Sequence, residues 1–147
     1  MRSLMFLLLL AALGVTACTP KAAAPTGQAA LPNVTSVAFN EKVSLRPGET
    51  VMVEGQVGRL TFVEVVNDSR CPEGVDCIRA GEAVVAVELA SGNQQEVAIA
   101  ADFRTAQRIV TGDIVINILG LTPYPREGSA STPEDYRLQV QTNAPRD

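Results

Sequence analysis

The chain has 147 residues, a length typical of one domain, and its 12 basic and 16 acidic residues give a formal net charge of −4. This balance argues against a nucleic-acid partner, which would require a basic surface, and against a polybasic membrane-surface module. Because the sequence contains no His, the commonest general base and metal ligand, we predict no enzyme, no metal ion and no other cofactor.

Residues 1–17 have the three parts of a secretory signal peptide. Residues 1–3 carry one positive charge, residues 4–15 are apolar, and the small residues Thr16 and Ala17 follow. The apolar run is shorter than the roughly 20 residues that span a bilayer. We therefore expect a signal helix that is removed, and not a retained transmembrane anchor.

The segment Val15-Thr16-Ala17-Cys18 resembles the lipobox of bacterial lipoproteins. In that family diacylglycerol is joined to the Cys thiol, and cleavage occurs just before this residue. The resemblance implies that Cys18 becomes the lipid-bearing first residue of the mature protein and anchors it in the cell envelope. Thr19, where inner-membrane lipoproteins carry Asp, implies the outer membrane, facing the periplasm, in a Gram-negative cell. An ordinary signal peptide, leaving Cys18 as a free thiol, is the alternative.

Residues 18–36 form a predicted linker between the lipid and the domain. The stretch is rich in Ala, Pro and Thr, carries one charge and shows no hydrophobic period. Such a composition is typical of a flexible, disordered tether. We therefore assign residues 1–17 to the signal peptide, 18–36 to the lipidated Cys with its linker, and 37–143 to a single folded domain.

The domain shows the alternation of apolar and polar residues that is typical of half-buried strands. The segments with this pattern are 50–54, 83–89, 96–101, 114–119 and 136–141, and residues 60–66 form a nearly continuous apolar run. Turn sequences occur at 46–49, 91–93 and 111–113, and the Pro-rich stretch 122–135 is a predicted loop. The pattern predicts an all-β fold of about seven strands, either an antiparallel Ig-like β-sandwich or a small barrel.

Two cysteines remain if Cys18 is acylated, and they lie in the chemically distinctive segment 67–82. Because an exported compartment is oxidising, we predict a structural disulfide between Cys71 and Cys77. Closing this short loop contributes roughly 2–2.5 kcal/mol through chain entropy. A redox-active pair and a zinc site are the alternatives, but the spacing is not C-x-x-C and no His is available as a further ligand.

Three carboxylates surround the predicted disulfide loop: Asp68, Glu73 and Asp76. Oxygen-rich loops can bind Ca²⁺, although the spacing here is neither that of an EF-hand nor that of a calcium-binding repeat. The alternative is that Asp68 caps a turn and the other two carboxylates are solvated. The sequence leaves both interpretations open.

The run Asp68-Ser69-Arg70 is predicted to be architectural. A long loop must satisfy its own backbone groups, and Asp and Ser side chains do this through local hydrogen bonds. We expect Arg70 to pair in a fork with a carboxylate such as Glu82 or Asp76. The competing hypothesis is that Arg70 points outward and contacts a partner or an anion.

Several segments of the chain resemble a family of uncharacterised bacterial secreted proteins and lipoproteins. The resemblance covers most of residues 37–142, and its most specific part is Asp68-Ser69-Arg70-Cys71-Pro72. Members of the family often carry Trp at the position of Arg79. The family has no assigned activity, so the resemblance implies a fold and no function. The segments concerned are Phe39-x-Glu41, Pro47-Gly48-Glu49, residues 68–72, Cys77-Ile78-x-Ala80-Gly81-Glu82-Ala83 and residues 121–125.

Three functional hypotheses follow from the sequence. The first is a non-catalytic envelope domain that binds a protein or glycan partner. The second is a lipoprotein that binds a small ligand or a cation through the 68–82 loop. The third is a hydrolase that uses carboxylates alone, which would require two facing carboxyl groups in a groove.

Overall fold

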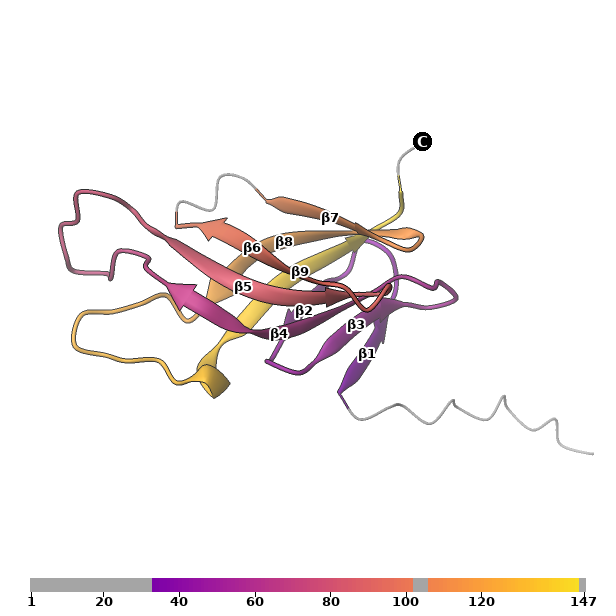
Figure 1. The fold of residues 1–147 in the computed structure, drawn as a ribbon, viewed down its shortest axis with the longest axis horizontal. Helices are drawn as coiled ribbons and strands as arrows, with labels where there is room; N and C mark the ends of the chain where they lie inside the picture. The colour runs from indigo at the N-terminus through magenta and orange to yellow at the C-terminus, as the bar shows by residue number, and fades with distance from the viewer. Residues whose placement is uncertain (1–32, 102–105, 146–147) are drawn as a thin grey trace, which may run out of the picture.

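The computed structural model describes residues 33–101 and 106–145. The predicted signal peptide, Cys18 and most of the predicted linker lie outside the described residues. Within them the chain forms nine strands in two sheets, packed face to face as a β-sandwich (Figure 1). None of the helical structure in these residues is long and apolar enough to cross a membrane.

One sheet has five strands and the other has four. The five-stranded sheet has the order β1-β3-β4-β5-β6, and the four-stranded sheet has the order β2-β9-β8-β7. Neighbouring strands are antiparallel, except that β1 and β3 are parallel. The strands are β1 (Val34–Val37), β2 (Lys42–Leu45), β3 (Thr50–Val53), β4 (Arg59–Asp68), β5 (Glu82–Leu89), β6 (Gln94–Ala100), β7 (Gln107–Thr111), β8 (Ile114–Thr122) and β9 (Arg137–Asn143).

The core lies between the two sheets and is built by the alternation seen in the sequence. Every second residue of the longer strands points inward, which removes its apolar side chain from water. This confirms the predicted all-β sandwich; the strands form two sheets and not a closed barrel. The largest fully buried side chains include Leu60, Phe62, Val85 and Val87 from one sheet and Leu45, Ile116, Ile118 and Leu138 from the other.

Three strands were not identified from the sequence: β1, β2 and β7. Each has only four or five residues, and its apolar positions are too few to show a period. Pairing with β3, β9 and β8 holds these short segments extended. Strand β1 begins at Val34, so the domain starts inside the stretch assigned to the linker 18–36.

Two register shifts in β4 change which of its side chains face the core. They lie between Phe62 and Glu64 and between Val65 and Asn67, where β4 has an extra residue relative to β5. Such bulges re-aim the side chains that follow them. Asp68 is consequently paired with Ala83, which is fully buried, so a carboxylate comes to the core side at the end of β4.

Candidate functional site

Two loops lie together at one end of the sandwich, on the left in Figure 1. Residues 69–81 connect β4 to β5, and residues 123–136 connect β8 to β9. The amide of Glu73 donates to the carbonyl oxygen of Pro125 at 2.9 Å, and Arg126 Nε donates to Glu73 Oε2 at 3.0 Å. These contacts join the two loops into one surface, here called the two-loop end.

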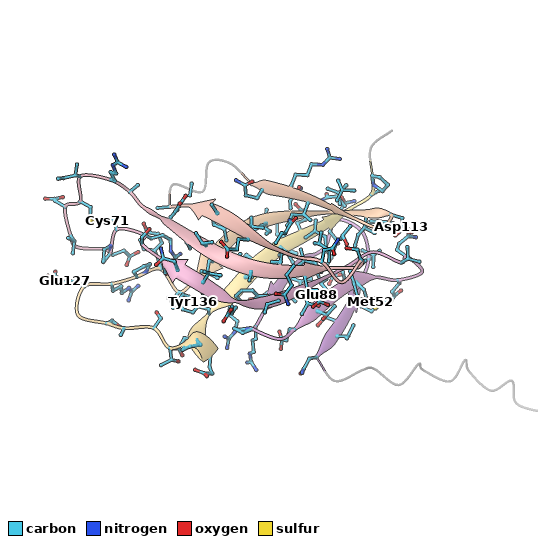
Figure 2. The ribbon with its side chains drawn as sticks, in the orientation of Figure 1. Met52, Cys71, Glu88, Asp113, Glu127 and Tyr136 are labelled. Carbon is cyan, nitrogen blue, oxygen red and sulfur yellow. A yellow bond between two sulfur atoms is a disulfide. The ribbon has the colours of Figure 1, made fainter. Side chains whose placement is uncertain are left out.

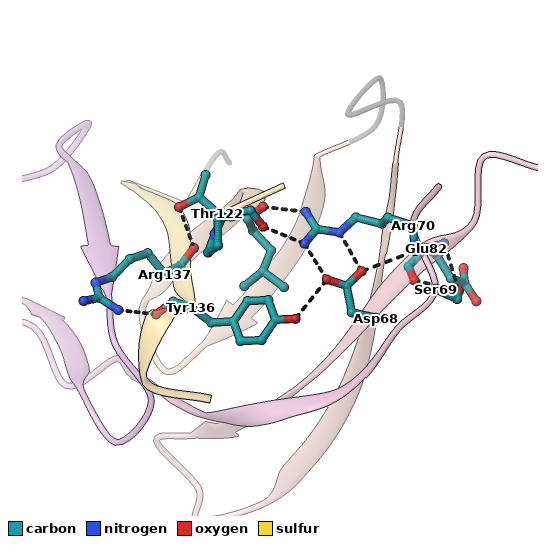
Figure 3. Close-up of polar contacts among 9 residues, drawn as sticks. Asp68, Ser69, Arg70, Glu82, Thr122, Tyr136 and Arg137 are labelled. Atoms are coloured by element: carbon teal, nitrogen blue, oxygen red, sulfur yellow. Dashed lines mark hydrogen bonds and ion pairs between the residues drawn. The ribbon is translucent and has the colours of Figure 1, made fainter. Parts of the chain in front are cut away.

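Arg70 is the buried centre of the two-loop end, with 2% of its surface exposed. Its Nε and Nη2 atoms donate to the two carboxylate oxygens of Asp68 at 2.8 and 2.6 Å, which is a bidentate fork (Figure 3). Its Nη1 donates to the carbonyl oxygen of Leu121 at 2.6 Å, and Nη2 also donates to that of Pro123 at 2.9 Å. One guanidinium therefore fastens the end of β4 to the end of β8.

Both tyrosines of the chain contact this ion pair. The ring of Tyr124 lies 5.0 Å from the guanidinium carbon of Arg70, within the range of a cation–π contact. The hydroxyl of Tyr136 donates to Asp68 Oδ2 at 3.2 Å, as Figure 3 shows. The pair is thus covered by aromatic side chains from the 123–136 loop.

The electrostatics of the pair favour its charged form. Desolvation acts to raise the pKa of Asp68, but the hydrogen bonds and the charge of Arg70 outweigh it, so the pKa lies below the ordinary value of 3.8. Desolvation and then the negative charge of Asp68 raise the pKa of Tyr136 above 10.0. At neutral pH the ion pair is charged and the phenol is neutral, so the hydroxyl remains a donor.

The partner of Arg70 is Asp68, and the expectation of Glu82 or Asp76 was wrong. The bulges in β4 turn Asp68 toward the core side, whereas Asp76 and Glu82 are exposed. Ser69 holds the base of the loop, because its amide and its hydroxyl both donate to the carbonyl oxygen of Glu82, at 2.8 and 2.9 Å.

The predicted disulfide between Cys71 and Cys77 is confirmed, with a Cα–Cα distance of 6.0 Å. The amide of Cys71 also donates to the carbonyl oxygen of Ala80 at 2.8 Å, which closes the loop again at its base. Ile78 lies on this loop with its side chain fully exposed. Figure 2 places Cys71 at the opposite end of the molecule from Asp113.

The carboxylates of the loop do not converge on one point. Asp68 is bonded to Arg70, and Glu73 pairs with Arg126 on the surface. In the described part of the chain, no three His, Cys, Asp or Glu side chains are grouped so that they could hold a metal ion. The cation-binding hypothesis gains no support from this geometry. The lowered pKa of Asp68 is also the opposite of what a carboxylic acid needs to donate a proton.

Sequence reasoning missed the contributions of the 121–136 segment and of Ile78. Residues 121–125 were singled out only by the family resemblance. The carbonyl groups that accept hydrogen bonds from Arg70 belong to the backbone, so residue types do not indicate them. A usable signal was the position of the two tyrosines, since both lie in or beside the Pro-rich stretch 122–135. Both tyrosines are half-buried in the structure, and a tyrosine in such a position usually bonds its hydroxyl to a polar group, which here is Asp68 for Tyr136.

No family model, curated protein or solved structure matches the chain. The resemblance to uncharacterised secreted proteins therefore stays a prediction.

Proposed function

We propose that this protein is a lipid-anchored domain of the cell envelope that binds a protein partner through the two-loop end and has no catalytic role. Cys18 provides the anchor and the sandwich provides a rigid support. The 69–81 loop provides the contact surface. The lipobox-like segment supports the anchor, and the oxidised Cys71–Cys77 pair is consistent with an exported protein.

The observation that carries the proposal is the full exposure of Ile78 on a loop beside the Cys71–Cys77 disulfide. Leaving such a side chain in water forgoes about 1.5–3 kcal/mol of burial free energy. The same loop is fixed by a disulfide and by the buried Arg70, so its shape is set before any partner arrives. A preorganised loop loses little conformational entropy on binding. An apolar side chain presented in this way is suited to fill a pocket on another protein.

The position of the loop agrees with this role. The described chain enters the sandwich at β1, and the 69–81 loop projects from the end away from β1 (Figure 1). A domain tethered through the segment that precedes β1 would leave this end accessible to other envelope components.

A photo-crosslinking residue at position 78 is expected to yield a discrete adduct in intact cells. Val57 is the matched control, because it is also exposed on a turn, and its amide contacts Asp113 at the other end of the molecule. The adduct is identified by gel shift and mass spectrometry, and protease treatment distinguishes a protein from a glycan. Identical adducts from positions 57 and 78, or none from position 78, would contradict binding at this loop.

Replacing the anchor tests the other half of the proposal. Cys18→Ala is expected to abolish the incorporation of radiolabelled fatty acid and to release the protein from the membrane fraction. The reason is that the thiol of Cys18 is the predicted site of acylation, and alanine has no thiol that could carry the lipid. Equal labelling of wild type and variant would refute lipidation at Cys18.

A further inference from the structure

Strand β6 is an edge strand of the five-stranded sheet. It pairs with β5 along its whole length, and no strand of the described residues pairs with its other side. Its seven residues include no Pro, Gly or Lys and one charge, Glu96. The other edge strands are shorter, with four residues in β1 and β2 and five in β7. Long, regular edges are sites where a further strand adds.

The direction of the free backbone groups of β6 follows from two hydrogen bonds. The amide of Leu89 donates to Asn93 at 2.9 Å, and the amide of Ala101 donates to Gly81 at 3.3 Å, at opposite ends of the β5–β6 ladder. Paired residues of an antiparallel ladder alternate between bonded and non-bonded. In the observed register the odd-numbered residues of β6 therefore bond to β5. The N–H and C=O groups of Gln94, Glu96, Ala98 and Ala100 point away from β5, and no strand in the described part of the chain pairs with them.

A hollow of about 260 Å³ lies beside this edge, between residues 95–98 of β6 and residues 107–109 of β7. It carries one acidic and one basic side chain, Glu96 and Arg108. In a two-fold interface, the same patch of each copy faces that of the other copy. A patch that carries both an acidic and a basic side chain can therefore be complementary to itself. The composition of the hollow therefore favours a second copy of this chain as its occupant.

We propose that two copies of the protein associate by pairing β6 with β6 in antiparallel orientation, with the two-fold axis at Val97. In this register Glu96 lies opposite Ala98 of the second copy, and Gln94 lies opposite Ala100. All four residues with free backbone groups are then bonded, which gives about eight hydrogen bonds between the chains. The two five-stranded sheets become one continuous sheet.

The alternative registers are less favourable. Centring the axis on residue 96 places Glu96 directly opposite its own copy, and like charges opposite each other destabilise a strand pair. It also leaves Ala100 without a bonded partner. Centring the axis on residue 98 leaves Gln94 without one. The register centred on Val97 uses the whole edge and sets each charge against an alanine.

The interface is small. Stable protein interfaces bury about 1,200 Å² or more, and a single added strand contributes only part of such an area. We therefore expect a reversible dimer whose population rises with protein concentration, and not a permanent assembly.

The pairing is tested in the full-length chain with Val97→Cys, followed by oxidation in intact cells. Residue 97 would face its own copy across the two-fold axis at a distance that a disulfide can bridge. Val110→Cys is the control, because Val110 is 60% exposed on β7 and would not face its copy. A crosslinked dimer from position 97 and none from position 110 is expected on a non-reducing gel. No dimer from position 97, or equal dimer from both positions, would overturn the proposal.

A second pair of variants tests the register without touching the core. Ala98 is exposed, so Ala98→Glu and Ala98→Lys should both fold as the wild type does. In the Ala98→Glu variant, the new carboxylate of each copy would lie opposite Glu96 of the other copy, which should weaken association about tenfold. Ala98→Lys would place a positive charge there and should preserve or strengthen association. Sedimentation equilibrium of the full-length chain in detergent measures both. An equal response to the two substitutions, or a monomeric wild type at the highest soluble concentration, would overturn the pairing.

Discussion

Arg70→Ala is expected to lower the free energy of unfolding by about 3–5 kcal/mol, a large share of the stability of a domain of this size. The substitution leaves the carboxylate of Asp68, whose side chain is 9% exposed, without its charged partner. It also removes the donor from the carbonyl groups of Leu121 and Pro123. A buried charge without a partner costs more free energy than the intact ion pair contributes. The expected loss of stability therefore comes mainly from the unpaired carboxylate of Asp68.

Urea unfolding followed by circular dichroism measures this loss, and the chain offers a matched control. Arg126 also pairs with a carboxylate, that of Glu73, but both side chains are more than half exposed. Arg126→Ala should therefore cost at most about 1 kcal/mol. The double variant Asp68→Leu with Arg70→Met should be more stable than Arg70→Ala, because it removes both charges together. Unchanged stability of Arg70→Ala, together with loss of the crosslink from position 78, would instead make Arg70 a contact residue.

The pH dependence gives an independent measure of the same pair. The pKa of Asp68 is lower in the folded protein than its ordinary value of 3.8. The stability that this shift contributes is fully present above 3.8 and is lost as the pH falls through the lowered value. The difference in stability between wild type and Arg70→Ala should therefore shrink on acidification below pH 3.8. A difference that stays constant into this range would show that the charge of Asp68 is not responsible.

The fold was largely predictable because five segments show a period of two and residues 60–66 form a short apolar run, which are both typical of strands that bury apolar side chains. Segments 60–66 and 83–89, for example, became β4 and β5 because their apolar side chains fill the core. The short strands β1, β2 and β7 escaped prediction because their extended form depends on neighbours and not on their own pattern. Strand β1 pairs with β3, which follows it in the chain after β2, and this parallel pairing has no local signal.

Of the contacts at the two-loop end, the disulfide was the one that the residue types could predict. The Cys71–Cys77 disulfide was predicted because Cys18 was expected to be acylated and the protein was expected to reach an oxidising compartment. The partner of Arg70 depends on two bulges in β4, and a bulge is not visible in the residue types alone. The groups that complete the site at Leu121, Pro123 and Tyr136 lie 51–68 residues away from Arg70 or Asp68 along the chain. A single sequence does not specify such distant contacts.

Gly81→Ala is expected to lower the free energy of unfolding by about 2–4 kcal/mol and to disturb the base of the 69–81 loop. Gly81 has φ of +71°, where a side chain costs roughly 1–2 kcal/mol. A Cβ atom there would also overlap with the carbonyl oxygen of Ser69. That backbone cannot move freely, because the amide of Ser69 is bonded to Glu82 across the base of the loop.

Gly92→Ala is the control that shows how much of the effect of Gly81→Ala comes from positive φ alone, without a steric clash. Gly92 has φ of +81°, and nothing lies within 4 Å of the position of its missing Cβ, so this variant should lose only about 1–2 kcal/mol. Urea unfolding compares the two, and amide hydrogen exchange locates the effect. Gly81→Ala should lose protection at the amides of Ser69 and Ala101, which bond at the loop base, while Gly92→Ala retains it. Equal destabilisation with protection kept in both variants would show that the loop base yields to a methyl group, and that Arg70 and the disulfide alone fix the surface carrying Ile78.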